Sequence, residues 1–432
     1  MFIHIKQILY RVRNSIFIQN VGWVAGLSSV ERIAAFLQTI LIARALGITE
    51  YGVYGLLFGT IGFTASVTGL QMGLTATVFV ARYKESNKAK ARLVIQYVNR
   101  FSLIVSAVFF FVTLPFSKII SVWLLSSDQR VLAIVAGCAL VSGSLLSGAQ
   151  QGVAQGFEDF KAIALIRIIT SVFTLLAIYP SAMVFGLEGV LILLLGSLFL
   201  QYLFLTFVVH KNQLELKFPK QGSGVKFGDL IMGFSAPSLL VNLLVGLAAW
   251  YGLFLLSKQG SGFDEVAIVN TGIQWRGSLL LVSSALGSVA IPAFSKMKGA
   301  GNAIAANKLI NRLLWSNGVA ALGVVIVVTL LADPILGLYG QGFLRGKAVF
   351  LILLAATIPQ IMGNVYMQNL VGAGKMWLQL CLYIPFFMCS LPGFIFLIPK
   401  YSGMGYAVTM MLSTFVFALF AAGVFRKVKV TQ

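Results

Sequence analysis

Long apolar runs recur along the whole chain, and each is long enough to cross a lipid bilayer as a helix. A helical span needs about 20 apolar residues to cross about 30 Å of hydrocarbon, and its backbone polar groups must be satisfied within the protein. The runs are too long, and alternate too seldom, for barrel strands. We therefore expect an all-α polytopic membrane protein with spans near residues 16–43, 52–80, 99–125, 131–156, 162–184, 186–209, 229–257, 266–294, 310–332, 346–371, 378–398 and 404–425.

The composition and the distribution of charge agree with this class. The chain is 59% hydrophobic and 10% charged, whereas a soluble domain is about one quarter charged. The net charge of +20 would also suit nucleic acid, but 23 of the 32 lysines and arginines fall in segments expected on the cytoplasmic side and 7 on the external side. This bias follows the positive-inside rule. It predicts an inner-membrane protein with both termini in the cytoplasm, and it argues against nucleic acid as a partner.

The two halves of the chain repeat each other. A shift of 214 residues places Glu50-Tyr51 on Asp264-Glu265, and a shift of 216 places Gly186-Leu187-Glu188-Gly189 on Ser402-Gly403-Met404-Gly405. An even number of spans gives both halves the same orientation, as in transporters that bind substrate between two repeats. We expect two pseudo-symmetric six-helix lobes around a central cavity. The predicted parts are an interfacial helix at 1–15, a lobe at 16–209, a cytoplasmic linker at 210–228, a lobe at 229–425 and a cytoplasmic tail at 426–432.

Residue types that catalysis or metal binding would need are scarce. Cys138, Cys381 and Cys389 fall in apolar spans without ligand spacing, and His4 and His210 lie outside the membrane core. The chain has no phosphate loop followed by Lys-Ser/Thr and no Ser-His-Asp set. We therefore expect no enzymatic activity, no metal and no cofactor.

Polar side chains inside the predicted spans indicate helix faces suited to a hydrated path. Thr64, Thr68 and Gln71 recur every three or four residues in the second span, on one helical face. Gln38 and Asn242 add polar groups in the first and seventh spans. Hydrogen bonding between helices is the alternative, at about 0.6–2 kcal/mol per contact. Because polar sets occur in equivalent spans of both halves, we favour these five residues as substrate-binding candidates in the cavity.

Three charged residues lie deep within predicted spans, where a charge costs about 2.5–3.5 kcal/mol. They are Glu31, Arg32 and Arg276. One interpretation is an ion pair that joins two helices. The other is a cationic cavity wall that faces an anionic substrate, since arginine suits bidentate contact with phosphate. Glu31 is the one deep carboxylate in this reading of the spans, and it is therefore the candidate for ion coupling.

Two segments resemble those of a known family. Residues 45–57, ALGITEYGVYGLL, have its pattern of a helix, a short external turn and a restart that contains Tyr-Gly. Residues 285–292, ALGSVAIP, resemble the end of the eighth span in the lipid II flippases. The whole chain resembles a polysaccharide-unit flippase, of the O-antigen and capsule type, in the multidrug/oligosaccharidyl-lipid/polysaccharide exporter superfamily. Twelve spans suit the polysaccharide branch, because lipid II flippases typically add two more.

The resemblance implies a V-shaped cavity between two lobes, lined mainly by spans 1, 2, 7 and 8. The protein would accept a polyprenyl-diphosphate-linked oligosaccharide from the cytoplasmic leaflet and release it outside, while the lipid tail stays in the bilayer. The implied partners are a polysaccharide polymerase and a chain-length regulator, with H+ or Na+ as the coupling ion. Arg32 resembles a first-span cavity arginine of the lipid II flippases, whose next cationic position falls on Gln38 here. Arg276 resembles their eighth-span arginine but lies about one turn nearer Pro292.

Two other functions remain alternatives for a chain of this kind. An ion-coupled multidrug or cation exporter of the same superfamily would favour carboxylates within the membrane, whereas this chain has Glu31 against two arginines. An oligosaccharide polymerase or ligase usually needs a long external catalytic loop, and the predicted external loops are short. The balance of charge therefore favours an anionic substrate.

Overall fold

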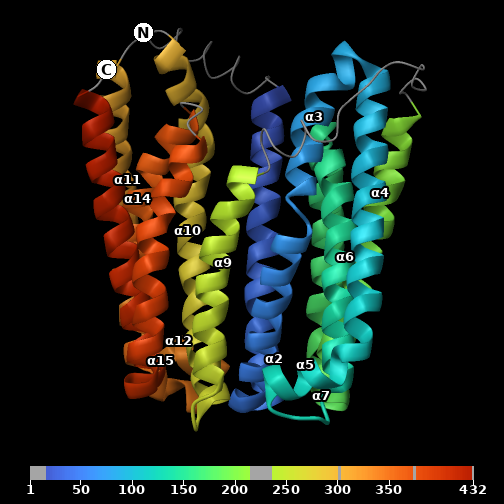
Figure 1. Cartoon of the computed structure of the whole chain (residues 1–432), viewed down its shortest axis with the longest axis vertical. Helices are drawn as coiled ribbons and strands as arrows, with labels where there is room; N and C mark the ends of the chain where they lie inside the picture. Colours follow the sequence, from blue (N-terminus) through green and yellow to red (C-terminus); the bar gives the residue numbers. More distant parts are fainter. Residues whose placement is uncertain (1–15, 215–235, 300–302, 373–375, 431–432) are drawn as a thin grey trace. The chain divides into compact units, whose positions relative to one another are not determined.

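The computed structural model describes residues 16–214, 236–299, 303–372 and 376–430, and these residues form helices joined by short turns (Figure 1). The predicted interfacial helix at 1–15 and most of the linker at 210–228 lie outside the described residues. The elements are α2 (Ile16–Thr68), α3 (Met72–Ser86), α4 (Lys88–Thr113), η1 (Leu114–Phe116), α5 (Ser117–Leu125), α6 (Val131–Gly156), α7 (Phe160–Gln213), α9 (Ala236–Ser257), α10 (Gly262–Gly299), α11 (Ala303–Leu330), α12 (Ala332–Tyr339), η3 (Gln341–Gly346), α13 (Lys347–Ala355), α14 (Thr357–Gly372) and α15 (Met376–Val430).

Eight helical segments of the described chain are long and apolar enough to cross a membrane. Three of them consist of two helices that meet at one non-helical residue, which is Gly47 in α2, Gly186 in α7 and Ser402 in α15. When each of these three segments is counted as two helices and α10 is added to the total, the helices correspond in order to the twelve predicted spans. The prediction of an all-α polytopic protein is confirmed.

The kinks in α7 and α15 confirm the internal repeat. Gly186 has φ 61° and ψ −143°, and Ser402, which the shift of 216 residues places on it, has φ 48° and ψ −126°. A Cβ atom on Gly189 would collide with the backbone carbonyl oxygen of a residue in the preceding helix, and a Cβ atom on Gly405 would do the same at the equivalent residue. The two helices of each pair therefore pack closely on each other, in the same way in both halves of the chain.

This equivalence leads to a prediction about stability. Ser402 holds a backbone conformation that glycine adopts without strain, and such strain costs about 1–3 kcal/mol. We expect Ser402→Gly to raise the free energy of unfolding by about 1 kcal/mol and Gly186→Ser to lower it by a similar amount. Thermal unfolding of the purified protein measures both changes. Gly196→Ser is the control, because Gly196 lies within a helix with open space beside it, and an unchanged midpoint for Gly186→Ser would contradict the argument.

The chain forms two compact units that differ from the predicted lobes in one segment. Unit 1 comprises residues 1–45 and 64–235, and unit 2 comprises residues 46–63 and 236–432. The segment 46–63, which was expected in the N-terminal lobe, thus packs within unit 2. Its small residues explain the close approach, since a Cβ atom on Gly52 would collide with the backbone of Phe263 in α10.

Aromatic side chains bury the segment 46–63 within unit 2. The ring of Tyr51 is fully buried against the rings of Tyr339 and Phe343, with centroids 6.3 and 5.7 Å away. Nearer the other end, the indole Nε1 of Trp250 in α9 donates a hydrogen bond of 2.9 Å to Thr60 Oγ1. Aromatic packing and this hydrogen bond therefore hold the segment 46–63 within unit 2.

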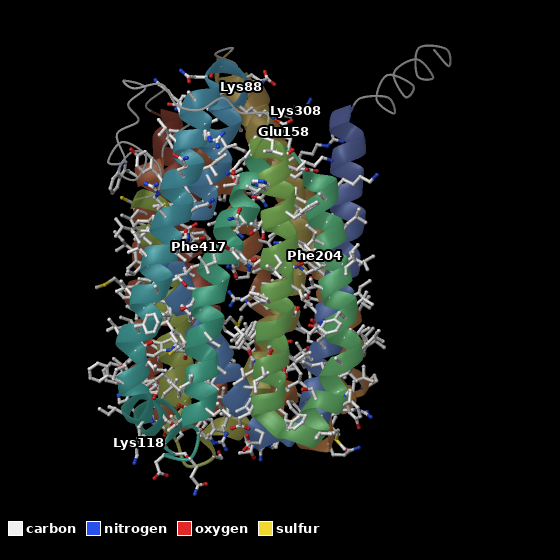
Figure 2. All side chains as sticks on the ribbon, turned by 90° about the vertical axis from the view of Figure 1, so that its right-hand side faces the viewer. Lys88, Lys118, Glu158, Phe204, Lys308 and Phe417 are labelled. Carbon is white, nitrogen blue, oxygen red and sulfur yellow. The ribbon has the colours of Figure 1, made fainter. Side chains whose placement is uncertain are left out.

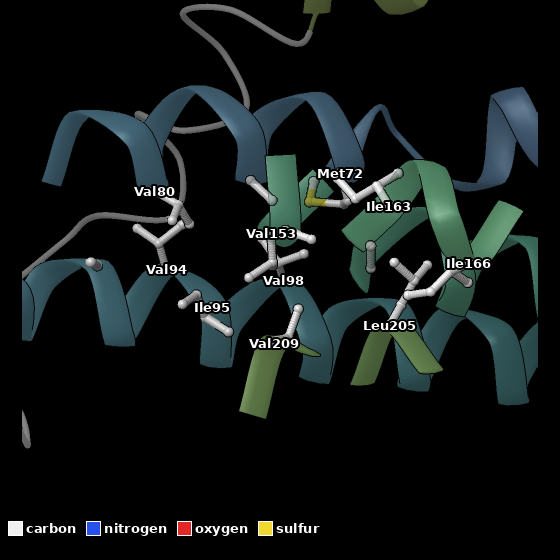
Figure 3. Packing of buried hydrophobic residues seen from close by; sticks show 14 residues of the cluster. Met72, Val80, Val94, Ile95, Val98, Val153, Ile163, Ile166, Leu205 and Val209 are labelled. Carbon is white, nitrogen blue, oxygen red and sulfur yellow. The ribbon is translucent and has the colours of Figure 1, made fainter. Parts of the chain in front are cut away.

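Unit 1 has a core of small and β-branched residues between α3, α4, α6 and α7 (Figure 3). Met72 and Val80 of α3 meet Val94 and Val98 of α4 and Val153 of α6 in this cluster. Glycines at 148, 152 and 156 form a small-residue row on α6, and a Cβ atom at 152 would collide with the backbone of α3. Small residues at such spacing let membrane helices approach closely, and this explains how α3 packs on α6.

The second predicted span is broken in the described structure. α2 ends at Thr68 and α3 begins at Met72, and between them Leu70 and Gln71 have left-handed φ values of 44° and 55°. Side chains other than glycine rarely adopt this conformation, which costs about 1–2 kcal/mol per residue. The expectation of one continuous helix over 52–80 is therefore corrected.

The surface of unit 1 carries charged residues at both ends of its helices and apolar residues between them. Figure 2 shows Lys88 and Glu158 at one end of this unit and Lys118 at the other, with Phe204 on α7 between them. The side chain of Phe204 is exposed, as are those of Leu103, Phe111 and Leu176. Exposed apolar side chains between two charged ends are typical of helices that face lipid.

Candidate functional site

An ion pair joins three helices of unit 1 at the predicted coupling residue. Arg167 Nη1 of α7 lies 3.1 Å from Glu31 Oε2 and 3.3 Å from Glu31 Oε1 of α2. Its Nη2 donates a hydrogen bond of 2.8 Å to Gln151 Oε1 of α6. The side chains of Arg167 and Glu31 are 32% and 28% exposed, so the pair is partly buried. Glu31 is therefore neutralised by a cation on a neighbouring helix.

Gln38 lies on the same face of α2 as Glu31, two helical turns further along. Its Nε2 donates a hydrogen bond of 3.0 Å to the backbone carbonyl oxygen of Ser171, one turn beyond Arg167 on α7. The two side chains together attach α2 to α7. The structure thus shows a packing contact for Gln38, and its contact with substrate stays a prediction.

Arg32 follows Glu31 directly, so its side chain leaves α2 about 100° further around the helix axis. The side chain is exposed, and no hydrogen bond or ion pair of Arg32 is found among the residues that the structure describes. The two neighbouring charges therefore differ: Glu31 is engaged within unit 1, while the Arg32 guanidinium remains available.

The three polar candidates of the second span lie at its break. Thr68 Oγ1 donates a hydrogen bond of 2.7 Å to the backbone oxygen of Thr64, and Gln71 is one of the two left-handed residues. All three are half-buried. The break removes the single continuous face on which they were expected, because Gln71 is not in helical register with Thr64 and Thr68.

Arg276 is buried inside unit 2 rather than exposed. Its residue surface is 7% accessible, and its Nη2 donates a hydrogen bond to Gln360 Oε1 of α14. Tyr406 and Tyr383 of α15 are close enough to influence its charge. The sequence prediction of an open cavity wall at Arg276 differs from this buried position, and its contact with substrate stays a prediction.

Gln274 and Arg276 point to different neighbours, as their spacing on one helix predicts. Gln274 Nε2 donates a hydrogen bond of 3.1 Å to the hydroxyl of Tyr51 in the segment 46–63, whereas Arg276 contacts α14. Asn242 on α9, the other candidate in unit 2, is exposed. Gln274 is therefore a packing residue, and Asn242 is available to a ligand.

Sequence reasoning missed the partner of Glu31. The sequence analysis places only Glu31, Arg32 and Arg276 deep within spans, but α7 begins at Phe160 and places Arg167 two turns inside the helix. A signal was present, because the predicted span at 162–184 already includes Arg167, although the sequence does not show that this residue faces Glu31. In the part of the chain that the structure describes, no group of three or more His, Cys, Asp or Glu residues is placed to hold a metal ion.

Comparisons with other sequences point to polysaccharide pathways. Residues 17–298 match the sequence profile of a family described as polysaccharide biosynthesis proteins. A related curated protein is the EPS I polysaccharide export inner membrane protein EpsE of Ralstonia nicotianae, which is 26% identical over 143 residues. That alignment covers 33% of this chain and 32% of EpsE, so the chain matches about one third of this relative.

Comparisons with solved structures identify the fold. An inward-facing multidrug resistance MATE family transporter of the MOP superfamily has a TM-score of 0.79 and 16% identity, covering 93% of this chain and 95% of that one. A MOP superfamily transporter from Pyrococcus furiosus has a TM-score of 0.68 and 15% identity, covering 95% and 96%. At these identities the likeness shows the fold, which is that of the MOP superfamily.

Proposed function

Because the chain belongs to the family of polysaccharide biosynthesis proteins and has the fold of MOP superfamily transporters, we propose that it is a flippase for lipid-linked oligosaccharides. It moves polyprenyl-diphosphate-linked repeat units across the cytoplasmic membrane for the synthesis of a surface polysaccharide such as O-antigen, capsule or exopolysaccharide. The chemistry is transport by alternating access, without enzymatic turnover.

The proposal depends on which of the deep charges in unit 1 is paired within the protein and which is exposed. Arg167 neutralises Glu31, whereas Arg32 is exposed and has no partner among the described residues. A cationic drug would need an available carboxylate, and a diphosphate needs an available cation. In a medium of low dielectric constant this electrostatic preference is stronger than in water.

Arginine also suits the geometry of the proposed substrate. Its planar guanidinium offers paired donors that match two phosphate oxygens, and it stays charged in any protein environment. The proposal rests on Arg32 for the contact with diphosphate and not on Arg276, which is buried inside unit 2. Gln38, Thr64, Thr68, Gln71 and Asn242 remain proposed contacts for the sugar units.

The course of the second span supports alternating access. Residues 46–63 pack within unit 2 and the residues from 64 onward pack within unit 1, so one span belongs to both. The strained residues Leu70 and Gln71 interrupt this span shortly after the change of unit. Strained backbone persists where the surrounding structure enforces it, often at switch regions. A break at this point lets the parts of the span move relative to each other.

The proposal also covers the location, partners and energy source of the protein. It lies in the inner membrane with both termini in the cytoplasm. It works beside a polysaccharide polymerase and a chain-length regulator, and it couples transport to H+ or Na+. Reporters inserted near residues 223 and 261 check the orientation. The first is expected in the cytoplasm and the second outside, because the charge bias follows the positive-inside rule.

The test is complementation of a strain that lacks its own flippase for the same repeat unit. We expect the wild-type gene to restore surface polysaccharide and to lower the pool of lipid-linked oligosaccharide on the cytoplasmic leaflet. Drug susceptibility is measured in the same strains. Restored drug resistance without any surface polysaccharide would replace the proposal with the multidrug or cation exporter. If the lipid-linked units stay on the cytoplasmic leaflet while the gene restores chain growth in a strain that lacks its polymerase, the polymerase would be favoured instead.

A further inference from the structure

Among the described residues of unit 2, the interior contains a positive charge without a negative one. Arg276 lies 12 residues after Asp264, which is about 18 Å along α10 from its first turn. This depth is near the middle of a hydrocarbon layer about 30 Å thick. A guanidinium cannot escape the cost of burial by losing its proton, because arginine stays protonated in proteins.

The acidic residues of unit 2 lie elsewhere. They are Glu50, Asp264, Glu265 and Asp333, and all four fall in the described part of the chain at the ends of helices. Arg345 lies 3.0 Å from Asp264 and 3.9 Å from Glu265, and Lys347 lies 2.7 Å from Asp333. In the described structure none of the four forms an ion pair with Arg276, whose hydrogen-bond partner is the neutral amide of Gln360.

Two hydrogen-bond donors near this charge are buried and unsatisfied. Arg276 Nε and the Tyr406 hydroxyl are both inaccessible and have no hydrogen-bond partner among the described residues. Arg276 interacts electrostatically with Tyr406, and the ring of Tyr406 is fixed by stacking on Phe394 with centroids 4.9 Å apart. A buried donor without an acceptor destabilises the folded protein, and each such group in a native structure requires an explanation.

A single bound anion would supply both the negative charge and the hydrogen-bond acceptor that this site lacks. We propose that Arg276 and Tyr406 bind a small inorganic anion of halide size inside unit 2, between α10, α14 and α15. The anion accepts from Arg276 Nε and from the Tyr406 hydroxyl, and it neutralises the guanidinium. Tyr383 stands beside the site as a further hydroxyl, because it too interacts electrostatically with Arg276. This inference does not depend on the transported substrate.

The test uses the purified full-length protein and chloride as the probe. Thermal unfolding is compared in sodium chloride and in sodium gluconate at equal ionic strength. We expect a midpoint higher in chloride by about 2–4 °C. Radiolabelled chloride should bind at one ion per chain. The same midpoint in both salts, without chloride binding, would mean that neutral dipoles alone balance Arg276 and would overturn the proposal.

Two variants separate an anion site from ordinary packing. Arg276→Gln should lose the chloride effect and should unfold in gluconate at a temperature at least as high as the wild type, because it lacks the unpaired buried charge. Tyr406→Phe keeps the ring that stacks on Phe394 and should lose at least half of the chloride effect. Arg82→Gln is the matched control, because Arg82 is exposed over the ring of Phe79 and should leave the effect intact. A full chloride effect in Arg276→Gln would assign the anion to another place.

Discussion

Replacement of Arg32 by alanine is expected to abolish export of the lipid-linked oligosaccharide while the protein remains in the membrane at its normal level. The guanidinium is exposed in unit 1 and has no partner among the described residues, so its removal leaves no buried charge behind. Loss of one member of a desolvated, hydrogen-bonded charge pair costs about 2–5 kcal/mol. This range corresponds to a loss in affinity of about 30-fold or more.

The measurement is surface polysaccharide in a flippase-deficient strain, with the amount of membrane protein quantified beside it. Arg32→Lys should restore export only in part, because lysine keeps the charge but lacks the planar pair of donors. Arg82→Ala is the matched control, since Arg82 is an exposed arginine of the same unit within a basic cluster. Normal export by a well-expressed Arg32→Ala protein would remove Arg32 from substrate binding and favour a substrate without concentrated negative charge.

Removal of the carboxylate from Glu31 is expected to have two separable effects. Glu31→Gln leaves Arg167 partly buried without its ion pair. The expected cost lies between the value of about 1 kcal/mol for an exposed pair and that of about 3–5 kcal/mol for a fully buried one. We therefore expect less Glu31→Gln protein in the membrane. If Glu31 also couples transport to an ion gradient, the protein that remains should fail in gradient-driven transport.

A double variant distinguishes stability from coupling. In Glu31→Gln combined with Arg167→Gln no charge is left unpaired, so we expect the membrane level to return while gradient-driven transport stays absent. The control is Glu158→Gln, which disrupts the ion pair of 2.9 Å between Lys84 and the exposed Glu158 and should change neither readout, because exposed ion pairs contribute little. Transport at the wild-type rate by the double variant would show that the pair only joins helices.

The apolar runs and the internal repeat are sufficient, by themselves, to determine the fold class. A run of about 20 apolar residues has few alternatives to a membrane helix, so hydropathy along the chain places the spans. The repeat is readable because Gly189 and Gly405 mark the same close turn in both halves, and the matching conformations of Gly186 and Ser402 confirm it in the structure. The family resemblance likewise depends on local patterns that a sequence displays directly.

The choice of candidate charges also came from the sequence, but their partners did not. Glu31, Arg32 and Arg276 were recognisable because charges are rare in apolar spans. Hydrophobic length shows that a residue lies in a span and does not show which helix it faces. Only the packing of α7 on α2 brings Arg167 to Glu31, and only the contacts of α10 with α14 bury Arg276 against Gln360.

Two features of the second span depended entirely on tertiary structure. The segment 46–63 reads from the sequence as part of the first lobe, yet its contacts place it in unit 2. The left-handed residues Leu70 and Gln71 carry no signal of a break, since neither is glycine or proline. The local sequence determines which backbone conformations have low energy. A strained conformation is retained only where the packing of neighbouring helices offsets its strain, and the tertiary structure decides where that is.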